Sequence, residues 1–341
     1  MSYPPVTVVM SVYNGAKYLR ECLDSVLSQT FSDFEFIIVN DGSTDASPRI
    51  LNDFARRDRR IVIIDQMNQG LTKSLNRGLS IARGKYVARM DADDIIFPDR
   101  LETQLEFMAS NPDVGLLGTW CRVIDAAGRE GDVWSTPMGH HALQWQLCFD
   151  NIFAHSSAMM TRSALRDANG YDERCHRSQD FDLWARLSRR VRIDCLPRVL
   201  VCLRRHDVSI SATANDEQRR THAAVCRDLI NNIVQSSLSE SGNSVLQGDN
   251  GCESGFETEA ISAVLALYHA FMSRTHVGST ERFHIRKDAA RRIWAIARRK
   301  VHSPQMWPAL FKACCLDSAY SLSVLRAPFR RIAWLFPQSR V

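Results

Sequence analysis

The sequence predicts an α/β protein, in which a mostly parallel central sheet is flanked by helices and followed by a helical C-terminal appendage. Short apolar, β-branched runs alternate with segments that repeat apolar residues at helical spacing. The chain has 341 residues, 45% of them hydrophobic, which is enough for one large domain and an appendage. In such sheets, ligands bind beyond the carboxyl ends of the strands.

The alternation is clearest in the first ninety residues. We expect strands at 6–12, 34–39, 61–64 and 86–90, because these runs are short and apolar. We expect helices at 17–29, 48–57 and 71–82, where the apolar residues recur every three or four positions. Polar clusters follow three of the strands and are expected at one edge of the sheet, at residues 13–15, 40–45 and 91–94.

The acidic cluster after residue 90 suits a divalent cation. Asp91 and Asp93 are two apart, so in extended backbone their carboxylates point to the same side and repel each other unless a cation lies between them. Oxygen ligands favour Mg²⁺ or Mn²⁺ over zinc. An acidic surface turn at the end of a strand is the alternative, and this pair alone does not exclude it.

The cluster at 40–45 suits a nucleotide. Asp41 can accept the imide N–H of uracil, and Gly42 allows a close approach of the backbone. Residues 43–45 can cap the next helix. A capped strand–helix turn without a ligand explains the same residues, and by themselves they favour that reading. The sequence contains neither G-x-G-x-x-G nor a P-loop, so phosphates must be held in another way.

Charge and composition divide the chain. From Arg274 onward there are 14 Lys and Arg against 3 Asp and Glu, whereas the first 273 residues carry 29 against 35. Residues 236–256 are rich in Ser, Gly and Asn, which is typical of a linker. We therefore expect a catalytic domain at 1–235, a linker or flexible loop at 236–256 and a basic helical region at 257–341.

The same composition indicates a cellular compartment. The sequence shows no secretory signal and no apolar run of membrane-spanning length. Its ten cysteines are scattered and form no C-x-x-C pair. We expect reduced thiols in a cytoplasmic protein.

Several ordered motifs resemble the family 2 glycosyltransferases of the GT-A fold. The resemblance covers roughly residues 5–210 and rests on the following segments: 5–14 (PVTVVMSVYN), 38–45 (IVNDGSTD), 68–70 (NQG), 76–78 (NRG), 91–94 (DADD), Pro98 and Arg100-Leu101. Their joint occurrence, in this order and spacing, is far more specific than any one of them.

The resemblance implies roles for the donor side. Asp41 would read the uracil of a UDP-sugar, Asp91 and Asp93 would form the D-x-D pair with Asp93 as the main metal ligand, and Arg89 would lie beside the sugar diphosphate. Asn40 stands where the family usually has a first Asp, but Asp41 remains. The further nucleotide-sugar contacts that the resemblance implies are Ser11, Tyr13, Asn14, Asn68, Gly70, Lys73 and Ala92.

On the acceptor side, residues 170–173 and 178–187 resemble the segment that carries the catalytic base in this family. Gln179 replaces the usual Glu, so Asp180 is our candidate base, which would deprotonate the attacking hydroxyl with inversion at the anomeric carbon. Helix capping is the alternative for Asp180 and Asp182, with Asp182 the better structural candidate. Trp184 and Leu187 are expected in the core.

Three further residues are candidates with open alternatives. His155 resembles a position lining the acceptor pocket and is equally consistent with a structural histidine. Arg204 and His206 resemble a late loop over the diphosphate, where they would neutralise phosphate charge and His206 would add a metal ligand. A solvated basic turn is the alternative for both.

The chain is thus expected to transfer a sugar, with Mg²⁺ or Mn²⁺, from a UDP-sugar to a glycan or lipid-linked acceptor in the synthesis of a surface polysaccharide such as capsule, O-antigen or exopolysaccharide. The rivals are a metal-dependent nucleotidyltransferase, which would release pyrophosphate, and a non-catalytic nucleotide-sugar or glycan-binding protein, against which Asp180 argues.

Helical periodicity at 257–273, 282–301 and 304–336 suggests basic amphipathic helices. The aromatic and basic stretch 324–336 suits peripheral contact with an anionic membrane, on the inner face of the cell membrane. Packing on the catalytic domain or on a second subunit is the alternative. No nucleic-acid partner is expected, because no recognised binding module accompanies the charge.

Overall fold

The structure is a computed structural model that describes residues 3–206, 216–248, 255–300 and 303–318. These residues form two compact units, the first from Met1–His140 and Asn151–Gln218 and the second from His141–Asp150 and Arg219–Val341. The compact units divide after residue 218, and the expected catalytic domain at 1–235 stays a prediction. The short segment 141–150 belongs to the second unit although it lies in the N-terminal half of the sequence.

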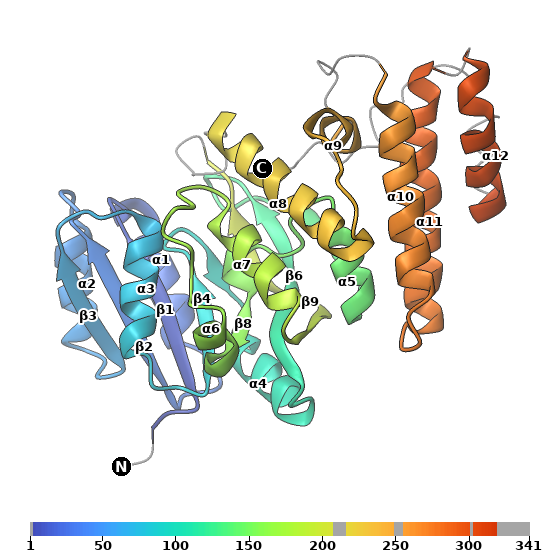
Figure 1. Cartoon of the computed structure of the whole chain (residues 1–341). Helices are drawn as coiled ribbons and strands as arrows, with labels where there is room; N and C mark the ends of the chain where they lie inside the picture. The colour runs from blue at the N-terminus through green and yellow to red at the C-terminus, as the bar shows by residue number, and fades with distance from the viewer. Residues whose placement is uncertain (1–2, 207–215, 249–254, 301–302, 319–341) are drawn as a thin grey trace. The chain divides into compact units, whose positions relative to one another are not determined.

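The first unit is built on one sheet, as Figure 1 shows. Across the described residues the strand order is β3-β2-β1-β4-β8-β6-β9-β5, and β7 pairs with β6. Strands β3, β2, β1 and β4 run parallel, whereas β8 is antiparallel to both β4 and β6. The expected α/β class is confirmed. The strands are β1 (Val6–Val12), β2 (Phe34–Asp41), β3 (Ile61–Gln66), β4 (Tyr86–Met90), β5 (Ile95–Ile96), β6 (Val114–Ile124), β7 (Glu130–Trp134), β8 (Met159–Thr161) and β9 (Arg192–Arg204).

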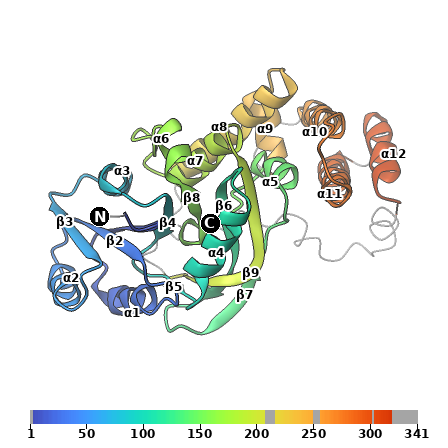
Figure 2. The same cartoon turned by 90° about the horizontal axis from the view of Figure 1, so that it is seen from below.

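Helices cover both faces of this sheet, and Figure 2 shows α1 and α2 on one side and α3 on the other. Alternate residues of β1, such as Val8 and Met10, share a core with the apolar sides of α1 and α2. On the opposite face α3 packs so closely that a Cβ on Gly78 would come within 2.9 Å of the Val9 side chain. The helices of this unit are α1 (Ala16–Leu27), α2 (Ser47–Ala55), α3 (Leu71–Ile81), α4 (Arg100–Ser110), α6 (Arg162–Asp167) and α7 (Gln179–Ser188).

Side-chain hydrogen bonds and packing fix local structure that the apolar pattern of the sequence does not describe in full. Asp45 Oδ1 accepts the N–H of Ser47, the first residue of α2, at 2.9 Å, so one of residues 43–45 caps this helix as expected. In addition, Ser43 Oγ and Asp45 Oδ2 accept backbone N–H groups from Asn14 and Ala16, at 3.0 Å each, and so fix the start of α1. Residues His155–Ser157 form a 3₁₀ turn that leads into β8. The prediction that Trp184 and Leu187 lie in the core is confirmed, since both are fully buried.

The second unit is helical. Apart from the first residue of α5 and the first three of α8, which belong to the first unit, it contains α5 (His140–Leu147), α8 (Asp216–Val234), α9 (Glu240–Leu246), α10 (Glu257–Met272), α11 (Ser279–Ala297), the 3₁₀ turns Arg298–Lys300 and Pro304–Met306, and α12 (Trp307–Leu316). Helix α9 lies inside the expected linker 236–256, because Ser239 caps it and the Glu259 carboxylate accepts bonds from Ser239, at 2.7 Å each, while Val245 and Leu246 are buried.

Two expectations concern membranes. None of the helices in the described part of the chain is long and apolar enough to cross a bilayer. The proposed membrane-contacting stretch 324–336 lies outside the described residues, so it stays a prediction.

Candidate active site

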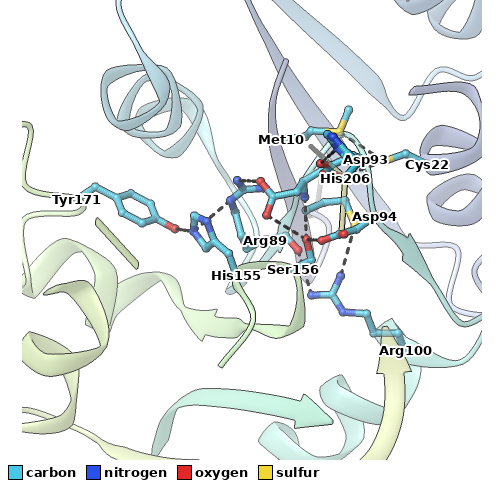
Figure 3. Close-up of polar contacts among 12 residues, drawn as sticks. Met10, Cys22, Arg89, Asp93, Asp94, Arg100, His155, Ser156, Tyr171 and His206 are labelled. Carbon is cyan, nitrogen blue, oxygen red and sulfur yellow. Dashed lines mark hydrogen bonds and ion pairs between the residues drawn. The ribbon is translucent and has the colours of Figure 1, made fainter. Parts of the chain in front are cut away.

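The acidic cluster, Asp91, Asp93 and Asp94, follows β4 in the middle of the sheet. Figure 3 shows Asp93 and Asp94 with their polar neighbours. The side chains of Asp91 and Asp93 are each 31% exposed, whereas Asp94 is 1% exposed. Two carboxylates therefore reach the surface and the third lies inside.

Buried hydrogen bonds of Asp94 and Ser156 fix the loop that carries the acidic cluster, residues 91–94. The Ser156 hydroxyl donates to Asp94 Oδ2 at 2.5 Å, and the backbone N–H of Arg204 donates to Asp94 Oδ1 at 2.8 Å. Ser156 Oγ also accepts the Asp91 N–H at 2.9 Å. Burial raises the pKa of Asp94 well above its usual value, and the charges of Asp93 and Asp91 add to the effect. Asp94 is thus a positioning residue of the loop.

Asp91 is held by Arg89, with which it forms a partly buried ion pair. Burial acts to raise the pKa of Asp91, but the Arg89 charge, with help from the hydrogen bonds of Arg89 and Ser156, outweighs it, and the pKa lies below its usual value. Asp91 is therefore an oriented carboxylate, with one of its oxygens already committed to Arg89.

Asp93 carries the predicted metal position. His206 Nε2 lies 3.0 Å from Asp93 Oδ2, and the His206 ring packs on Tyr18 with ring centroids 5.0 Å apart. Burial raises the pKa of Asp93 and the Asp91 charge raises it further, while the His206 hydrogen bond acts in the opposite direction. A nearby cation would relieve this repulsion.

The described side chains could supply only part of the coordination shell of a divalent cation, and a bound ligand would supply the rest. In the described part of the chain, no group of three or more His, Cys, Asp and Glu side chains forms a metal site by itself. Asp93 and His206 offer one oxygen and one nitrogen, so diphosphate oxygens and water would have to complete an octahedral shell.

Arg204 does not have the predicted role of neutralising phosphate. Its side chain is 2% exposed, and its guanidinium is already bonded to Glu21 Oε2 at 2.6 Å, to the Asp93 carbonyl at 2.9 Å and to the Asp125 carbonyl at 3.3 Å. The sequence pattern predicted that the Arg204 side chain lies beside the diphosphate. In the structure this side chain is buried and its hydrogen bond to the Asp93 carbonyl stabilises the acidic loop. The neighbouring residues 207–209 of the expected loop lie outside the described residues.

A buried chain of polar groups runs from Asp91 to Tyr171. Arg89 Nε donates to His155 Nε2 at 3.1 Å, and the Tyr171 hydroxyl lies 2.7 Å from the same nitrogen. Because an arginine Nε–H can only donate, His155 Nε2 must be an unprotonated acceptor. Burial and then the Arg89 charge lower the pKa of His155 to about 3, which agrees with a neutral ring. Arg89 Nη1 is buried and has no hydrogen-bond partner among the described residues.

Asp180 lies near the start of α7, in the same neighbourhood. Its Oδ2 accepts a hydrogen bond from Asn151 Nδ2 and its Oδ1 accepts the Phe181 N–H, both at 2.8 Å. Burial raises the pKa of Asp180 and the Asp91 charge adds to this, against the two hydrogen bonds, so the two carboxylates lie within electrostatic reach. Asp182 differs, because it pairs with Arg186 at 2.7 Å. Gln179, the residue that replaces the usual Glu, is buried.

Asp41 organises the loop after β3. Its carboxylate accepts hydrogen bonds from Gln66 Nε2 at 2.7 Å, from the Gln69 N–H at 2.8 Å and from the Gly70 N–H at 2.9 Å. A carboxylate has about four acceptor positions, so one is left for a ligand. Gly42 is required here, since its φ is +73° and a Cβ would lie 2.7 Å from the Asn68 nitrogen.

The other predicted donor contacts surround this loop and the acidic cluster. Asn14 accepts the Thr44 N–H at 2.8 Å and so ties residues 13–15 to residues 43–45. Tyr13, Asn68, Gly70 and Lys73 are exposed, while Ser11 and Ala92 are half-buried. All of them come after the carboxyl end of a parallel strand or close to it, as predicted.

Asn40, which stands where the family usually has an aspartate, makes a hydrogen bond that an ionised aspartate could not donate. Its Nδ2 donates to Asp65 Oδ1 at 2.7 Å, across the register pair of β2 and β3. We expect Asn40→Asp to lower the free energy of unfolding by about 1–3 kcal/mol at neutral pH, because two carboxylates then face each other. Their folded-state pKa values would rise, so the loss grows as pH increases and shrinks in acid. Urea unfolding across pH measures it.

The reciprocal pair is the control. Asn40→Asp combined with Asp65→Asn restores one donor and one acceptor and should recover most of the lost stability. An Asn40→Asp protein as stable as the unchanged chain at neutral pH would contradict the pairing.

Comparison with known proteins identifies the class first. The fold is similar to that of Staphylococcus aureus TarS 1–349 in complex with UDP-GlcNAc, with a TM-score of 0.56 and 17% sequence identity, over 96% of this chain and 93% of that one. It is the GT-A fold of glycosyltransferases, as expected.

Sequence relatives identify the family. The glycosyl transferase family 2 profile matches residues 7–168. An uncharacterized glycosyltransferase of Haemophilus influenzae is 31% identical over 240 residues, which are 67% of this chain and 73% of that protein. The O-antigen biosynthesis glycosyltransferase WbnJ of Escherichia coli is 33% identical over 61% of this chain and 83% of that protein. The chain belongs to the family 2 glycosyltransferases.

Proposed function

We propose that this glycosyltransferase moves a sugar from a UDP-sugar to a hydroxyl group of a glycan or lipid-linked acceptor, with inversion, and that it uses Mg²⁺ or Mn²⁺. The observation that carries the proposal is the partly exposed Asp93, held by His206, two residues from Asp91, whose charge acts on the pKa of the candidate base Asp180. A structural relative of the same fold was solved with UDP-GlcNAc, which supports a UDP-sugar as the donor.

Donor binding follows from the two clusters at the carboxyl ends of β2 and β4. Asp41 has an acceptor position for the uracil imide, and the loop that it fixes lies beside it. Arg89 Nη1 is a buried donor with no partner in the described part of the chain, and a buried unpaired donor is costly unless a ligand oxygen accepts from it. We assign it to an oxygen of the sugar diphosphate.

Asp93 and His206 would hold the divalent cation against the diphosphate. When bound, that cation offsets the negative charge that develops on the leaving group. Asp91 would contribute a fixed negative charge at the same place, because Arg89 orients it.

Asp180 would act as the base. Its carboxylate is oriented by Asn151 and the Phe181 N–H, so it is prepared to take the proton of an acceptor hydroxyl as that oxygen attacks the anomeric carbon. Attack from the side opposite to the departing UDP inverts the anomeric configuration.

The acceptor belongs to the synthesis of a polysaccharide in this proposal. Relatives in this family include proteins named for O-antigen biosynthesis and for chondroitin synthesis. Family membership favours glycosyl transfer over nucleotidyl transfer and over binding without catalysis. A panel of UDP-sugars assayed for metal-dependent release of UDP, and UTP with sugar 1-phosphates assayed for release of pyrophosphate, test all three: pyrophosphate release from UTP, or binding of UDP-sugars without UDP release, would overturn the proposal.

The hydrogen bond from Asn151 predicts a pH effect. The bond stabilises the ionised form of Asp180, so Asn151→Ala should raise the pKa of this carboxyl further. Since the base must be ionised, the acid limb of kcat/KM should move to higher pH, with the rate at high pH changed less than the rate at low pH. A pH profile of UDP release measures the shift, and a profile that keeps its acid limb would contradict the assignment.

A further inference from the structure

A cavity of about 840 Å³ lies in the first unit where β1 and β4 begin. Three segments meet there: the Tyr86 N–H donates to the Pro5 carbonyl at 3.0 Å, and the Arg162 N–H donates to the Lys85 carbonyl at 2.9 Å. The acidic cluster follows the other end of β4, about 17 Å away at about 3.3 Å per residue. The cavity is therefore separate from the candidate active site.

The cavity is strongly basic. Arg83, Lys85, Arg162 and Arg166 line it, all four are exposed, and none of the described residues that line the cavity is acidic. Only two of the four cations are balanced. Arg83 pairs with Glu35 at 2.6 Å, and Arg166 lies 3.5 Å from the exposed Asp167.

Lys85 and Arg162 carry the uncompensated charge. No carboxylate in the described part of the chain lies within ion-pair distance of either of them. Arg162 Nη1 donates to the Ala82 carbonyl at 3.1 Å, which anchors its guanidinium at the cavity wall. A concave site with excess positive charge raises the local concentration of anions.

The remaining lining groups suit hydroxyls and sugar rings. The Asn169 side chain and the hydroxyls of Ser80 and Ser163 can hydrogen-bond to a polyol. Tyr3, which is 69% exposed, offers a ring face beside Pro4. The volume falls within the range of about 300–1,000 Å³ found for small-ligand sites.

We propose that this cavity binds an anionic carbohydrate, that is, a saccharide with carboxylate, sulfate or phosphate groups. Only the choice of a carbohydrate rests on the proposed function; the anion site stands on the uncompensated charges of Lys85 and Arg162. An extended nucleic acid would need a basic stripe rather than a cavity, and a membrane surface would need an apolar face beside the charge.

Binding of a sulfated tetrasaccharide to the full chain, measured by calorimetry at low salt, tests the proposal. Lys85→Gln combined with Arg162→Gln removes the two uncompensated charges and should weaken binding at least tenfold. The matched control, Arg57→Gln with Arg59→Gln, removes two charges from the exposed turn before β3 and should bind like the unchanged chain. UDP release from the donor should be the same in all three proteins, so a failure of the proposed transfer reaction is seen separately.

Four results would overturn the proposal. Equal binding by both double variants would show that the charge of the cavity is not used. Equal binding of the desulfated tetrasaccharide would remove the need for an anion. Inorganic phosphate binding as tightly as the tetrasaccharide would make this a small-anion site, and binding to phosphatidylglycerol vesicles but not to the tetrasaccharide would assign it to a lipid surface.

Discussion

Replacing Asp180 by Asn should lower kcat by about 10³-fold, because general-base catalysis of this kind contributes about 10²–10⁴-fold. The amide keeps the size of the side chain but cannot take the hydroxyl proton. Affinity for UDP should change little, since Asp180 bonds only to Asn151 and to the Phe181 backbone in the described structure. Steady-state UDP release together with UDP titration measures both quantities.

Asp182 is the matched control for that experiment. It lies two residues further along the same helix and is committed to Arg186. Asp182→Asn should lose a partly exposed ion pair, worth about 1 kcal/mol or less, and keep kcat within a few-fold. If Asp182→Asn loses as much turnover as Asp180→Asn, or if Asp180→Asn turns over almost normally, Asp180 is not the base.

The second large effect is expected at Asp93. Asp93→Asn should abolish metal-dependent turnover, with a loss of about 10²-fold or more, because one carboxylate of the cation site is gone. Its folded-state pKa is raised by burial and by Asp91, so the ionised form opposes folding at neutral pH. The variant should therefore be as stable as the unchanged chain, or more so, while inactive.

Manganese binding in the presence of UDP separates this loss from general damage. Asp93→Asn should need a much higher Mn²⁺ concentration for half-saturation. Asp99→Asn, a change of the same kind in the same segment, removes only an exposed pair with Arg198 and should keep both metal binding and turnover. Unchanged metal saturation in Asp93→Asn would refute the site, as would a large loss of stability.

Much of the fold could be predicted from the sequence because the buried faces of strands and helices require apolar residues at regular spacing. The strands 6–12 and 86–90 were predicted with the bounds that the structure has, since each is a short run buried on both faces. The helix α9 was missed, because its composition is that of a linker and the residue that fixes it, Glu259, lies 20 positions beyond its cap.

The residues of the candidate site also fall into two groups, those that a local motif predicts and those that only the fold brings together. Asp91 and Asp93 form a local motif, so their proximity follows from the spacing. Ser156, which bonds to Asp94, and Asn151, which bonds to Asp180, lie 62 and 29 residues from their partners, and no local pattern encodes such contacts. For Ser156, the one indication in the sequence was its position next to His155, which was already a candidate site residue. Arg204 was misassigned for the same reason, because its sequence neighbourhood is basic while its side chain is buried.

The inward bracing of the acidic loop limits how this enzyme can be recombined with its relatives. Asp94 and Asp91 are fixed by Ser156, while Arg204 holds Asp94 and the Asp93 carbonyl from the far end of β9. The half of the chain that would bind the donor is therefore not an independent module. A chimera that exchanges the acceptor-side segments to change specificity should keep Ser156 and Arg204 from this chain, or import all their partners with them.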